Sequence, residues 1–547
     1  MKIKAPDLVI QTLSNLGVDH LFHLPGNSIA SFYDSLARQK KIKSILFRHE
    51  QAACFAAAGY TLATNRTGVC MVMGGPGVTN LISAVAECYY QSIPLVIITV
   101  DNPKKNLGIE DFHEVDSFTM LSPVTKKTIC PGKIEDIQRG VVEALKCAST
   151  GRPGPVYLNI PVNLMGQSAR MKDVRLQQKP PRPSISQVRK ALKLIKASKD
   201  PVIFAGSGVI RSGAEKQLSE FIRLTGIPIL TSIGGRGAVP EGRPLVIGTP
   251  SYTFNVDFLN ESDLFIVLGT RLNPVNLRMG RLNIPEKMVQ VDTDEENPKF
   301  KKADIYIKSD IKEFLTLLNH ELKKDRAYRK QSRSSIYDTF RKSYADFTSA
   351  EYRNILKTTS RLTSKSFLLE LSKFLEDKDS AIFTDSIWIP FTHLLPRAKK
   401  SRSFFSMRSF GCLGFALPAA IGASISNKKR QIISLSGDGA FLFNCQELST
   451  AASYRLNNFT QIILNNSGFS SLYDIASSRF QGQNEYYLWD KIDYHGFSES
   501  LGVKAITVDS PSKIVPALRK AFSMNGPFVI NVITSDRDNM KGAYWTK

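Results

Sequence analysis

Short runs of aliphatic and β-branched residues alternate with longer amphipathic segments along most of the chain. These runs fall into three groups, at residues 44–47, 68–73, 94–100 and 155–160, at 201–206, 227–232, 263–269 and 288–292, and at 381–385, 431–439, 461–466 and 528–534. Strands that alternate with helices are typical of parallel sheets covered by helices on both faces. The pattern therefore predicts an α/β protein with three doubly wound parallel-sheet domains, at residues 1–165, 184–322 and 363–547.

Two stretches between these domains are predicted to be linkers. Residues 166–183 contain Pro180, Pro181 and Pro183, and residues 323–362 are rich in Lys, Arg and Ser. Such compositions are typical of connecting segments rather than of packed elements. A length of 547 residues agrees with three domains of ordinary size.

The composition is that of a globular protein. Apolar residues make up 42% and aromatic residues 9% of the chain, which excludes disorder and fibrous structure. The seven cysteines form no C-x-x-C pair, so we expect neither a disulfide scaffold nor a cysteine-rich zinc site. No run approaches the ~18 apolar residues of a membrane span, and Asp7, Gln11 and Asn15 interrupt the first segment. We therefore expect a cytoplasmic protein without a signal peptide or a membrane partner.

A formal net charge of +23 raises the question of a polyanionic partner. The basic residues gather at 170–199 and 323–333, close to the predicted linkers. No zinc finger, recognition helix or basic strand with interleaved aromatic residues accompanies them. We interpret the charge as a solvated basic surface and expect no nucleic-acid partner, with a polyanion-binding protein as the alternative.

Oxygen-bearing side chains follow two strands of the third domain. Asp438 stands between Gly437 and Gly439 at the end of one apolar run, and Asn465 and Asn466 end the next. Because parallel strands bring their carboxyl ends to one edge of the sheet, we expect these groups to lie together. Carboxylate, amide and carbonyl oxygens bind Mg²⁺ or Ca²⁺, and glycine lets a phosphate approach the backbone. The pattern predicts a cation and phosphate site in which either asparagine is a ligand.

The GDG sequence, followed by a helix, a strand and NN, resembles the motif with which thiamine diphosphate (ThDP) enzymes hold Mg²⁺ and the diphosphate of the cofactor. The resemblance implies that the metal ligands are Asp438, Asn466 and the carbonyl of Gly468. It also implies that the cofactor contacts the residues around this turn, Gly437, Asp438, Gly439 and Ala440, together with Asn466. Gly411-Cys412-Leu413-Gly414 resembles the segment whose bulky apolar residue supports the bent cofactor, which implies that role for Leu413.

A second set of motifs lies in the first domain. His49-Glu50-Gln51 opens a helix rich in small residues, and a Gly-Gly-Pro-Gly turn at residues 74–77 follows the next strand. The helix dipole favours a carboxylate at a helix start, and bare glycine backbone admits a flat heterocycle. HEQAA, GGPGVTN and SIPLVIITVD together resemble the pyrimidine-binding domain of the acetolactate synthase branch of ThDP enzymes. The resemblance implies that Glu50 bonds a pyrimidine nitrogen and that the ring also contacts Gly75, Pro76, Gly77 and Asn80.

The resemblance further implies a catalytic role for Glu50. In these enzymes a Glu on the pyrimidine ring favours the imino tautomer, whose exocyclic nitrogen removes the C2 proton of the thiazolium. The bent cofactor places that base within reach, and the carbanion chemistry belongs to the cofactor.

Four residues are predicted to line the substrate pocket. Asn27, after Leu24-Pro25-Gly26, occupies a position that faces the reacting centre in relatives, and Phe112-His113-Glu114 resembles their FQE segment with His in place of Gln. The resemblance implies catalytic roles for Asn27 and His113, the latter as a donor to an oxyanion or as a proton relay. Phe469 and Ser470, after the metal loop, are expected to line the same pocket.

One feature sets this chain apart from the acetolactate synthase pattern. Acetolactate synthases carry a Gln-His pair after the first strand of the third domain, where residues 384–388 here read Thr-Asp-Ser-Ile-Trp.

The central domain resembles one that binds FAD in some relatives, in which Gly206-x-Gly208 and Arg271 would contact FAD, but a lone G-x-G is weak evidence. We favour a structural central domain over one that binds FAD.

The resemblance covers essentially the whole chain. It implies ThDP- and Mg²⁺-dependent decarboxylation of a 2-oxo acid such as pyruvate, with transfer of the enamine to an acceptor such as a second 2-oxo acid. Because cofactor sites in this family lie between two subunits, a homodimer or homotetramer is implied. The alternatives are a simple decarboxylase or lyase that releases an aldehyde, and a non-catalytic protein of the ThDP fold. An oxidase would require a redox-active flavin.

Overall fold

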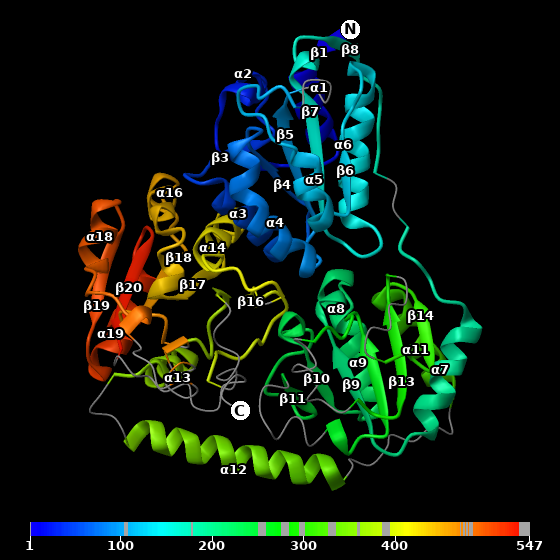
Figure 1. The fold of residues 1–547 in the computed structure, drawn as a ribbon. Helices are drawn as coiled ribbons and strands as arrows, with labels where there is room; N and C mark the ends of the chain where they lie inside the picture. Colours follow the sequence, from blue (N-terminus) through cyan, green and yellow to red (C-terminus); the bar gives the residue numbers. More distant parts are fainter. Residues whose placement is uncertain are drawn as a thin grey trace.

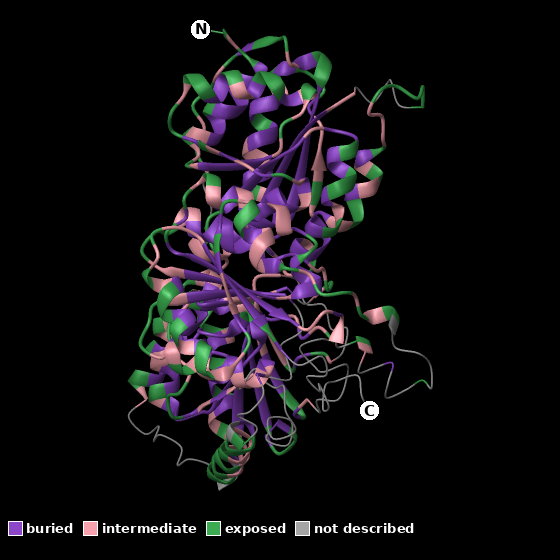
Figure 2. Ribbon diagram, turned by 90° about the vertical axis from the view of Figure 1, so that its left-hand side faces the viewer, coloured by how far each residue is buried: buried purple, intermediate pink, exposed green. Residues whose placement is uncertain are grey.

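Three six-stranded parallel sheets follow one another along the chain, each with helices on its faces (Figure 1). The computed structural model describes residues 2–102, 108–176, 179–249, 259–274, 284–294, 301–325, 335–357, 362–385, 394–407, 409–470, 472–473, 476, 480 and 485–534. The sheets and the helix faces that contact them are buried, and exposed positions lie on the outer helix faces (Figure 2).

The first sheet has the strand order β3-β2-β4-β5-β7-β6. Its strands are β2 (His20–His23), β3 (Lys43–Leu46), β4 (Gly68–Met71), β5 (Leu95–Asp101), β6 (Lys127–Ile129) and β7 (Pro155–Pro161). Its helices are α1 (Ala5–Asn15), α2 (Ala30–Arg38), α3 (Glu50–Thr64), α4 (Pro76–Tyr90), α5 (Ser117–Leu121) and α6 (Ile134–Ser149). The strand order reverses between β2 and β4, and open α/β sheets bind ligands at such a switch point.

The central sheet has the order β11-β10-β9-β12-β13-β14, with its switch point between β9 and β12. Its strands are β9 (Pro201–Ala205), β10 (Ile229–Thr231), β11 (Val246–Gly248), β12 (Leu264–Leu268), β13 (Lys287–Asp292) and β14 (Ile305–Lys308). The helices are α7 (Ile185–Ala197), α8 (Ser207–Ser212), α9 (Glu215–Thr225) and α11 (Ile311–Lys324).

The third sheet has the order β16-β15-β17-β18-β20-β19, with its switch point between β15 and β17. Its strands are β15 (Ser380–Thr384), β16 (Phe404–Ser406), β17 (Gln431–Gly437), β18 (Phe459–Asn465), β19 (Lys504–Val508) and β20 (Phe528–Ile533). The helices are α13 (Ser364–Phe374), α14 (Ala416–Ser426), α15 (Asp438–Phe441), α16 (Leu448–Ser453), α18 (Tyr494–Ser500) and α19 (Ile514–Ser523).

The two predicted linkers contain regular structure. In the first, β8 (Ser168–Arg170) pairs antiparallel with β1 (Lys2–Lys4). In the second, α12 (Ser335–Lys357) runs beneath the central and third domains in Figure 1. Tyr337 and Phe340 of α12 pack in the core of the central domain, and Ile355 packs in that of the third. These apolar contacts explain why a segment rich in charged residues is helical, since amphipathic burial stabilises a helix more than propensity does.

The first and third domains share one apolar core, in which α3 and α14 cross. The helices approach closely because small residues face each other at the crossing. A Cβ atom on Gly59 would lie 2.0 Å from the carbonyl oxygen of Ala419, and one on Gly422 would lie 2.0 Å from that of Ala56. The two sheets that carry the predicted cofactor motifs are therefore held in one body by a crossing that excludes larger side chains.

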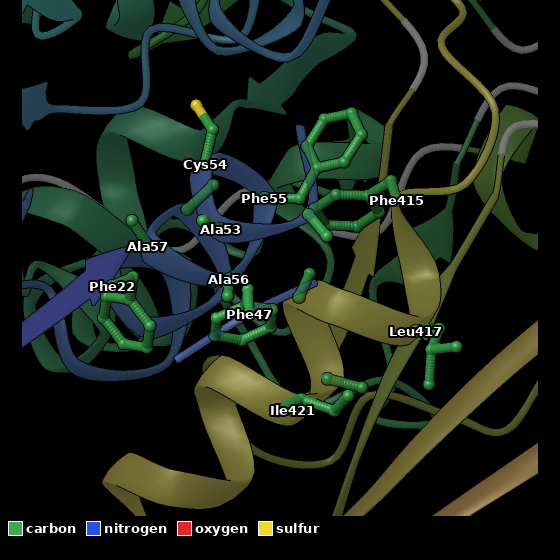
Figure 3. Packing of buried hydrophobic residues seen from close by; sticks show 14 of the residues in the cluster. Phe22, Phe47, Ala53, Cys54, Phe55, Ala56, Ala57, Phe415, Leu417 and Ile421 are labelled. Carbon is green, nitrogen blue, oxygen red and sulfur yellow. The ribbon is translucent and has the colours of Figure 1, made fainter. Parts of the chain in front are cut away.

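Aromatic packing extends the same core. Phe55 of α3 and Phe415, which precedes α14, meet edge to face with their ring centroids 5.5 Å apart (Figure 3). Such pairs stabilise by about 0.5–1.5 kcal/mol beyond their buried area. Phe47, which follows β3, is fully buried in this cluster, close to the start of α3.

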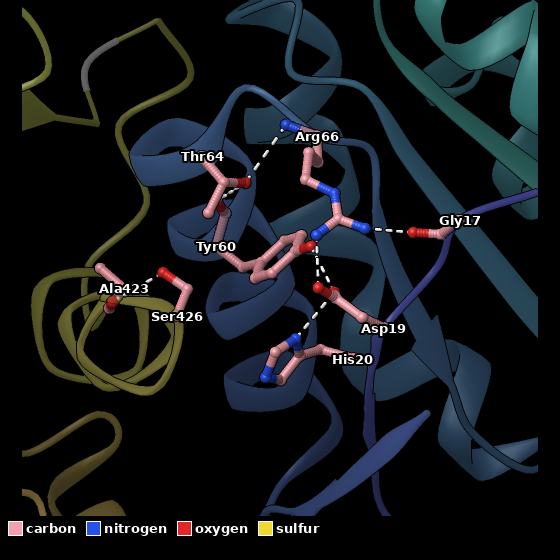
Figure 4. Close-up of polar contacts among 8 residues, drawn as sticks. All are labelled: Gly17, Asp19, His20, Tyr60, Thr64, Arg66, Ala423 and Ser426. Atoms are coloured by element: carbon pink, nitrogen blue, oxygen red, sulfur yellow. Dashed lines mark hydrogen bonds and ion pairs between the residues drawn. The ribbon is translucent and has the colours of Figure 1, made fainter. Parts of the chain in front are cut away.

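The C-terminal end of α3 is fixed by polar contacts around Asp19 (Figure 4). The hydroxyl of Tyr60 donates to Oδ1 of Asp19 at 2.6 Å, and Nδ1 of His20 lies 2.8 Å from the same oxygen. Arg66 bonds the second oxygen of Asp19 and the carbonyl of Gly17. The helix is therefore anchored at the end opposite Glu50.

We predict that Gly422→Ala destabilises the protein, although alanine normally favours a helix interior over glycine. The added methyl group would overlap the backbone of Ala56, and overpacking of this kind costs roughly 1–3 kcal/mol. Gly132→Ala is the matched control, because a Cβ there meets nothing within 4 Å. Thermal unfolding should show a lower Tm for Gly422→Ala and an unchanged one for Gly132→Ala. Equal Tm values for the two variants would contradict the close crossing.

Candidate active site

Glu50 is the first residue of α3, and its side chain is only 7% exposed. The preceding residue, His49, caps the helix, because its Nδ1 accepts a hydrogen bond from the amide of Gln51 at 3.1 Å. From α4, Nδ2 of Asn80 donates to Oε2 of Glu50 at 3.0 Å. A Cβ on Gly77 would lie 3.6 Å from Oε1 of Glu50. The structure thus brings Glu50, Gly77 and Asn80 together, as the sequence predicts.

The Gly-Gly-Pro-Gly turn leads from β4 into α4, which begins at Pro76. Gly75 has φ +62, and a Cβ there would lie 2.3 Å from the carbonyl oxygen of His113. His113 is half-buried and itself has a positive φ of 64. Beside the turn, burial raises the pKa of Asp101, which accepts hydrogen bonds from Ser117 and Tyr157. The predicted cofactor turn and His113 are therefore neighbours.

Asn27 lies on the loop after β2, at the switch point of the first sheet. Met73 packs against both Gly26 and Gly77. A Cβ on Gly26 would lie 2.6 Å from Cβ of Met73, and a Cβ on Gly77 would lie 3.1 Å from Cγ of Met73. Met73 therefore separates the Asn27 loop from the Gly77 turn. Asn27 is exposed at the start of a 3₁₀ turn, Asn27–Ile29, and its side chain is accessible to a ligand.

Asp438 lies at the carboxyl end of β17 and is 1% exposed. Its Oδ1 accepts a hydrogen bond from the amide of Gly439 at 3.0 Å, and its Oδ2 is buried without a hydrogen-bond partner. Burial raises the pKa of Asp438 to about 7. A buried oxygen without a donor is costly, so this carboxyl is suited to a cation. A Cβ on the adjacent Gly437 would meet nothing within 4 Å, which leaves room for a ligand.

The side chain of Asn466 faces Asp438. Oriented with its nitrogen toward them, the Asn466 amide donates to the carbonyl oxygen of Gly468 at 2.8 Å and to Oδ1 of Asp438 at 3.3 Å. Turned over, the amide would place its oxygen at the same point, and three oxygens would converge. Such a set is suited to a hard divalent cation. In the described ranges, no group of three or more His, Cys, Asp or Glu side chains is placed to hold a metal.

The neighbouring Asn465 has different contacts. It is the last residue of β18, and its Nδ2 donates to Oδ1 of Asn531 on β20 at 3.2 Å. Alternate residues of a strand point to opposite faces, which separates the two asparagines.

The two predicted pocket residues after the loop, Phe469 and Ser470, lie close to Asn466 and to the turn at Gly439. Ser470 bonds the Asn466 amide at 2.9 Å, and a Cβ on Gly439 would lie 2.5 Å from Cε1 of Phe469. Ala440, also predicted to contact the cofactor, is buried behind the turn at 2% exposure.

Leu413 is half-buried on the loop that leads into α14. The next residue, Gly414, has φ +79, and a Cβ there would lie 2.6 Å from Cβ of Phe443. Nδ2 of Asn444 donates to the carbonyl of Gly414 at 2.7 Å and to Oε1 of Gln51 at 3.0 Å. The Leu413 loop, the segment after α15 and the start of α3 are thereby connected within one chain.

Three buried carboxyl groups near these segments were not identified from the sequence. Glu87 of α4 and Asp385 after β15 bond the loop around Leu413, and Glu447 bonds the turn before Glu50. Glu87 is the one charged residue of the apolar helix sequence LISAVAECYY. A lone charge in an apolar helix indicates a buried group with specific partners, and this pattern can be recognised in the sequence. Asp385 belongs to the run that lacks the Gln-His pair, of which residues 386–388 lie outside the described residues.

The predicted FAD contact, Arg271, borders a cavity of about 230 Å³ at the switch point of the central sheet. Its Nη2 donates to the carbonyl of Tyr90 at 2.7 Å, and Arg211 donates to the carbonyl of Gln91 at 3.4 Å. Both arginines thus bond the C-terminal end of α4. Gly206 and Gly208 pack against the backbone of Gly269, where a Cβ on either would lie within 2.6 Å of it.

Comparison with known proteins bears on the whole chain. Models of thiamine pyrophosphate enzyme domains match it in order: the N-terminal TPP binding domain at residues 3–120, the central domain at 188–318 and the C-terminal TPP binding domain at 390–532. The chain is 32% identical to the probable acetolactate synthase large subunit of Methanocaldococcus jannaschii, over 97% of this chain and 92% of that protein. It is 32% identical to the acetolactate synthase of Mycobacterium bovis (96% and 87%) and 31% identical to the acetolactate synthase large subunit of Corynebacterium glutamicum (96% and 86%). The chain therefore belongs to the thiamine pyrophosphate enzyme family.

These findings confirm the predicted family with its acetolactate synthase-like branch, the three-domain α/β fold and the class of enzyme, a ThDP-dependent carboligase. In the part of the chain that the structure describes, no helix is long and apolar enough to cross a membrane. The roles of individual site residues, Mg²⁺, FAD, the oligomeric state and the cytoplasmic location stay predictions.

Glu447 offers a test of how the third domain holds the turn before Glu50. It is fully buried, its Oε1 accepts from the amide of Arg48 at 2.9 Å and its Oε2 accepts from the hydroxyl of Thr450 at 2.6 Å. Burial raises the pKa of Glu447 from 4.5 to about 7. The folded chain therefore binds this proton more tightly than the unfolded chain does. The resulting stability is fully present below about pH 4.5 and is lost as the pH rises through about 7.

We predict that Glu447→Gln makes the stability of the cofactor-free protein less dependent on pH. Between pH 5 and 8 the wild-type protein should lose stability relative to the variant, by an amount on the order of 3 kcal/mol. Thermal unfolding of both proteins across this range measures the difference. Parallel Tm curves would show that the carboxyl group of Glu447 titrates normally in the folded chain.

Proposed function

We propose that the protein catalyses the Mg²⁺-dependent decarboxylation of a pyruvate-like 2-oxo acid with bound ThDP and transfers the remaining fragment to an acceptor, a second 2-oxo acid by default. The observation that carries the proposal is the convergence of Asp438, Asn466 and the carbonyl of Gly468 at one sheet edge, in a chain that also buries Glu50 beside Gly77 and Asn80. The names of the acetolactate synthase relatives support the same reaction.

The third domain is proposed to bind the metal and the diphosphate. Asp438 would supply a carboxylate, Asn466 an amide oxygen and Gly468 a carbonyl oxygen, which are the ligands that Mg²⁺ prefers. The open space beside Gly437 supports a diphosphate at the turn. Because the Asn465 side chain bonds Asn531, we assign the ligand role to Asn466. Loss of the buried proton from Asp438 would accompany metal binding.

The first domain is proposed to bind the pyrimidine ring. Bound ThDP supplies a carbanion equivalent and an electron sink for decarboxylation. Glu50 would hold or release a proton at the ring nitrogen, and its burial beside Asn80 keeps water from competing for that proton. Gly75, Pro76 and Gly77 would let the ring approach the backbone, and Leu413 would support the bent cofactor from the third domain.

The substrate is proposed to lie between Asn27, His113, Phe469 and Ser470. Asn27 is accessible, and His113 adjoins the Gly75 turn, so both polar groups can meet a carboxylate or a carbonyl oxygen. Phe469 and Ser470 adjoin the metal loop. The absence of the Gln-His pair in the sequence supports a donor or acceptor different from those of standard acetolactate synthases.

We propose that two copies share each cofactor, with Glu50 of one and Asp438 of the other. In the described part of one chain, the hydrogen bond of the Glu50 side chain is with α4, and those of the Asp438 side chain are with Gly439 and the loop after β18. Apolar side chains near these segments are exposed: Tyr90 and Phe410, whose rings stack 5.7 Å apart, and Leu442 and Phe443. Exposed apolar surface of this kind is typical of an interface. A homodimer or homotetramer in the cytoplasm, without FAD or nucleic acid, completes the proposal.

A mixture of two inactive variants tests the shared site. Glu50→Gln and Asp438→Asn should each lower turnover at least about 100-fold, because each removes one essential group. In a one-to-one mixture that exchanges subunits, half of the dimers are mixed and each has one intact site, so about one quarter of the wild-type activity should return. The measurement is CO₂ release from the best 2-oxo acid in a screen that begins with pyruvate.

Two results would contradict the proposal. If the mixture stays inactive although subunits exchange, then both halves of the site belong to one chain. If the folded wild-type protein, supplied with ThDP and Mg²⁺, turns over none of the 2-oxo acids, then the protein is not a decarboxylase, and a non-catalytic role is favoured.

A further inference from the structure

The loop before α14 has an unusual set of backbone partners. Within the described chain, Ser409, Phe410, Gly411 and Cys412 all direct their amides to one carboxyl group, that of Glu87 on α4, with N···O distances of 3.0, 3.3, 2.8 and 3.1 Å. Glu87 belongs to the first domain and is 0% exposed. One buried side chain thus binds four consecutive amides that lie more than 300 residues away in the sequence.

A second carboxyl group holds the other side of the same loop. Oδ1 of Asp385, at the end of β15, accepts from the amides of Phe415 at 2.9 Å and Ala416 at 3.3 Å. Asp385 is 1% exposed. Leu413 lies between the two sets of bonded amides, with its neighbour Gly414 bonded through its carbonyl to Asn444.

Two residues of α4, Ser83 and Glu87, and its C-cap residue Gln91 face the loop, spaced four apart and hence on one side of the helix. Besides Glu87, the carbonyl of Ser83 accepts a hydrogen bond from Sγ of Cys412 at 3.2 Å. Nε2 of Gln91 donates to Oε1 of Glu87 at 3.1 Å and to the carbonyl of Ser406 at 3.0 Å. This side of α4 therefore supports Ser406 and the segment Ser409–Cys412.

The loop depends on these bonds because it has no regular secondary structure of its own. Gly411 and Gly414 have φ values of +91 and +79, which rule out a helix or a strand through this segment. A buried carboxylate is costly unless several donors compensate it, and hydrogen bonds to a charged group are stronger than neutral ones. Four amides meet that need at both oxygens of Glu87, and two amides meet it at Oδ1 of Asp385, so each carboxyl group and the loop stabilise one another.

We propose that Glu87 and Asp385 are positioning residues that clamp the loop from both sides and thereby fix Leu413 against the cofactor. The proposal rests on the role proposed above for Leu413. Neither carboxyl group is assigned a part in the chemistry: backbone amides bond both oxygens of Glu87 and Oδ1 of Asp385, and Oδ2 of Asp385 is buried without a hydrogen-bond partner. Their effect is to hold the side chain of Leu413 in a fixed position at the edge of the sheet, so that the bent cofactor contacts a rigid support.

Hydrogen exchange on the cofactor-free protein tests the clamp directly. In Glu87→Gln, which keeps the size of the side chain but loses its charge and one acceptor, the amides of Ser409–Cys412 should exchange at least about tenfold faster. Asp385→Asn should have the same effect on Phe415 and Ala416. Glu447→Gln is the matched control, because it removes a buried carboxylate that contacts Arg48 and Thr450 instead, and should leave this loop unchanged.

The second readout is the cofactor itself. ThDP with Mg²⁺, titrated by calorimetry, should bind Glu87→Gln at least about fivefold more weakly than wild type, and Glu87→Asp, which keeps the charge on a shorter arm, should be intermediate. The exchange of the C2 proton of bound ThDP, followed by NMR, should slow in the same order, while KM for the 2-oxo acid changes little. A merely structural carboxylate would lower Tm without this graded effect on C2 exchange.

The possible failures are distinguishable. Unchanged exchange of Ser409–Cys412 in Glu87→Gln, with normal ThDP binding by the wild-type protein, would overturn the clamp alone. Faster exchange without any change in ThDP affinity or C2 exchange would also overturn it, because the loop would then not support the cofactor. A wild-type protein that binds no ThDP would overturn the proposed function and this proposal together.

Discussion

Buried carboxyl oxygens that must find donors or a cation determine how this molecule is organised. At the carboxyl ends of its parallel strands, water is excluded and each unpartnered oxygen is costly. Glu87 meets the requirement at both of its oxygens with backbone amides, and Asp385 meets it with amides at Oδ1. Asp438 accepts one amide at Oδ1, its Oδ2 has no hydrogen-bond partner, and burial raises its pKa to about 7. A divalent cation bound at Asp438 would supply the missing partner of Oδ2, and the proposed function follows from that requirement.

The shared core of the first and third domains gives these groups a common frame. At the crossing of α3 and α14, Gly59 and Gly422 bring the two backbones into contact. The start of α3 carries Glu50, and the segment before α14 carries Leu413. A single helix crossing therefore fixes Glu50 and Leu413 relative to one another within one chain, in which each is proposed to act on a different one of the two shared cofactors, and the bonds of Asn444 to Gln51 and Gly414 reinforce it.

Much of the fold and of the candidate site was predictable from the sequence, because the patterns that indicate them are local. Strand runs and glycine turns predicted three parallel sheets and the placement of Asp438 beside the pair Asn465-Asn466, and the resemblance to ThDP enzymes implied that Glu50 and Gly77 contact the same ring. The choice between Asn465 and Asn466 required the direction in which each side chain leaves the strand. The partners of Glu87 are amides 322–325 residues away, which no local pattern reveals. Helix α12 was missed because its few buried residues, such as Tyr337 and Ile355, are spread among many charged ones.

The central claim is that Asp438 and Asn466 complete a magnesium site that binds ThDP. Calorimetric titration of ThDP into the folded protein, with Mg²⁺ and then with EDTA, tests it most directly. The account predicts binding that requires the metal, that weakens at least about tenfold in Asn466→Ala and that is nearly unchanged in Asn465→Ala. Metal-independent binding, equal affinity in Asn466→Ala, or no binding by the wild-type protein would contradict it.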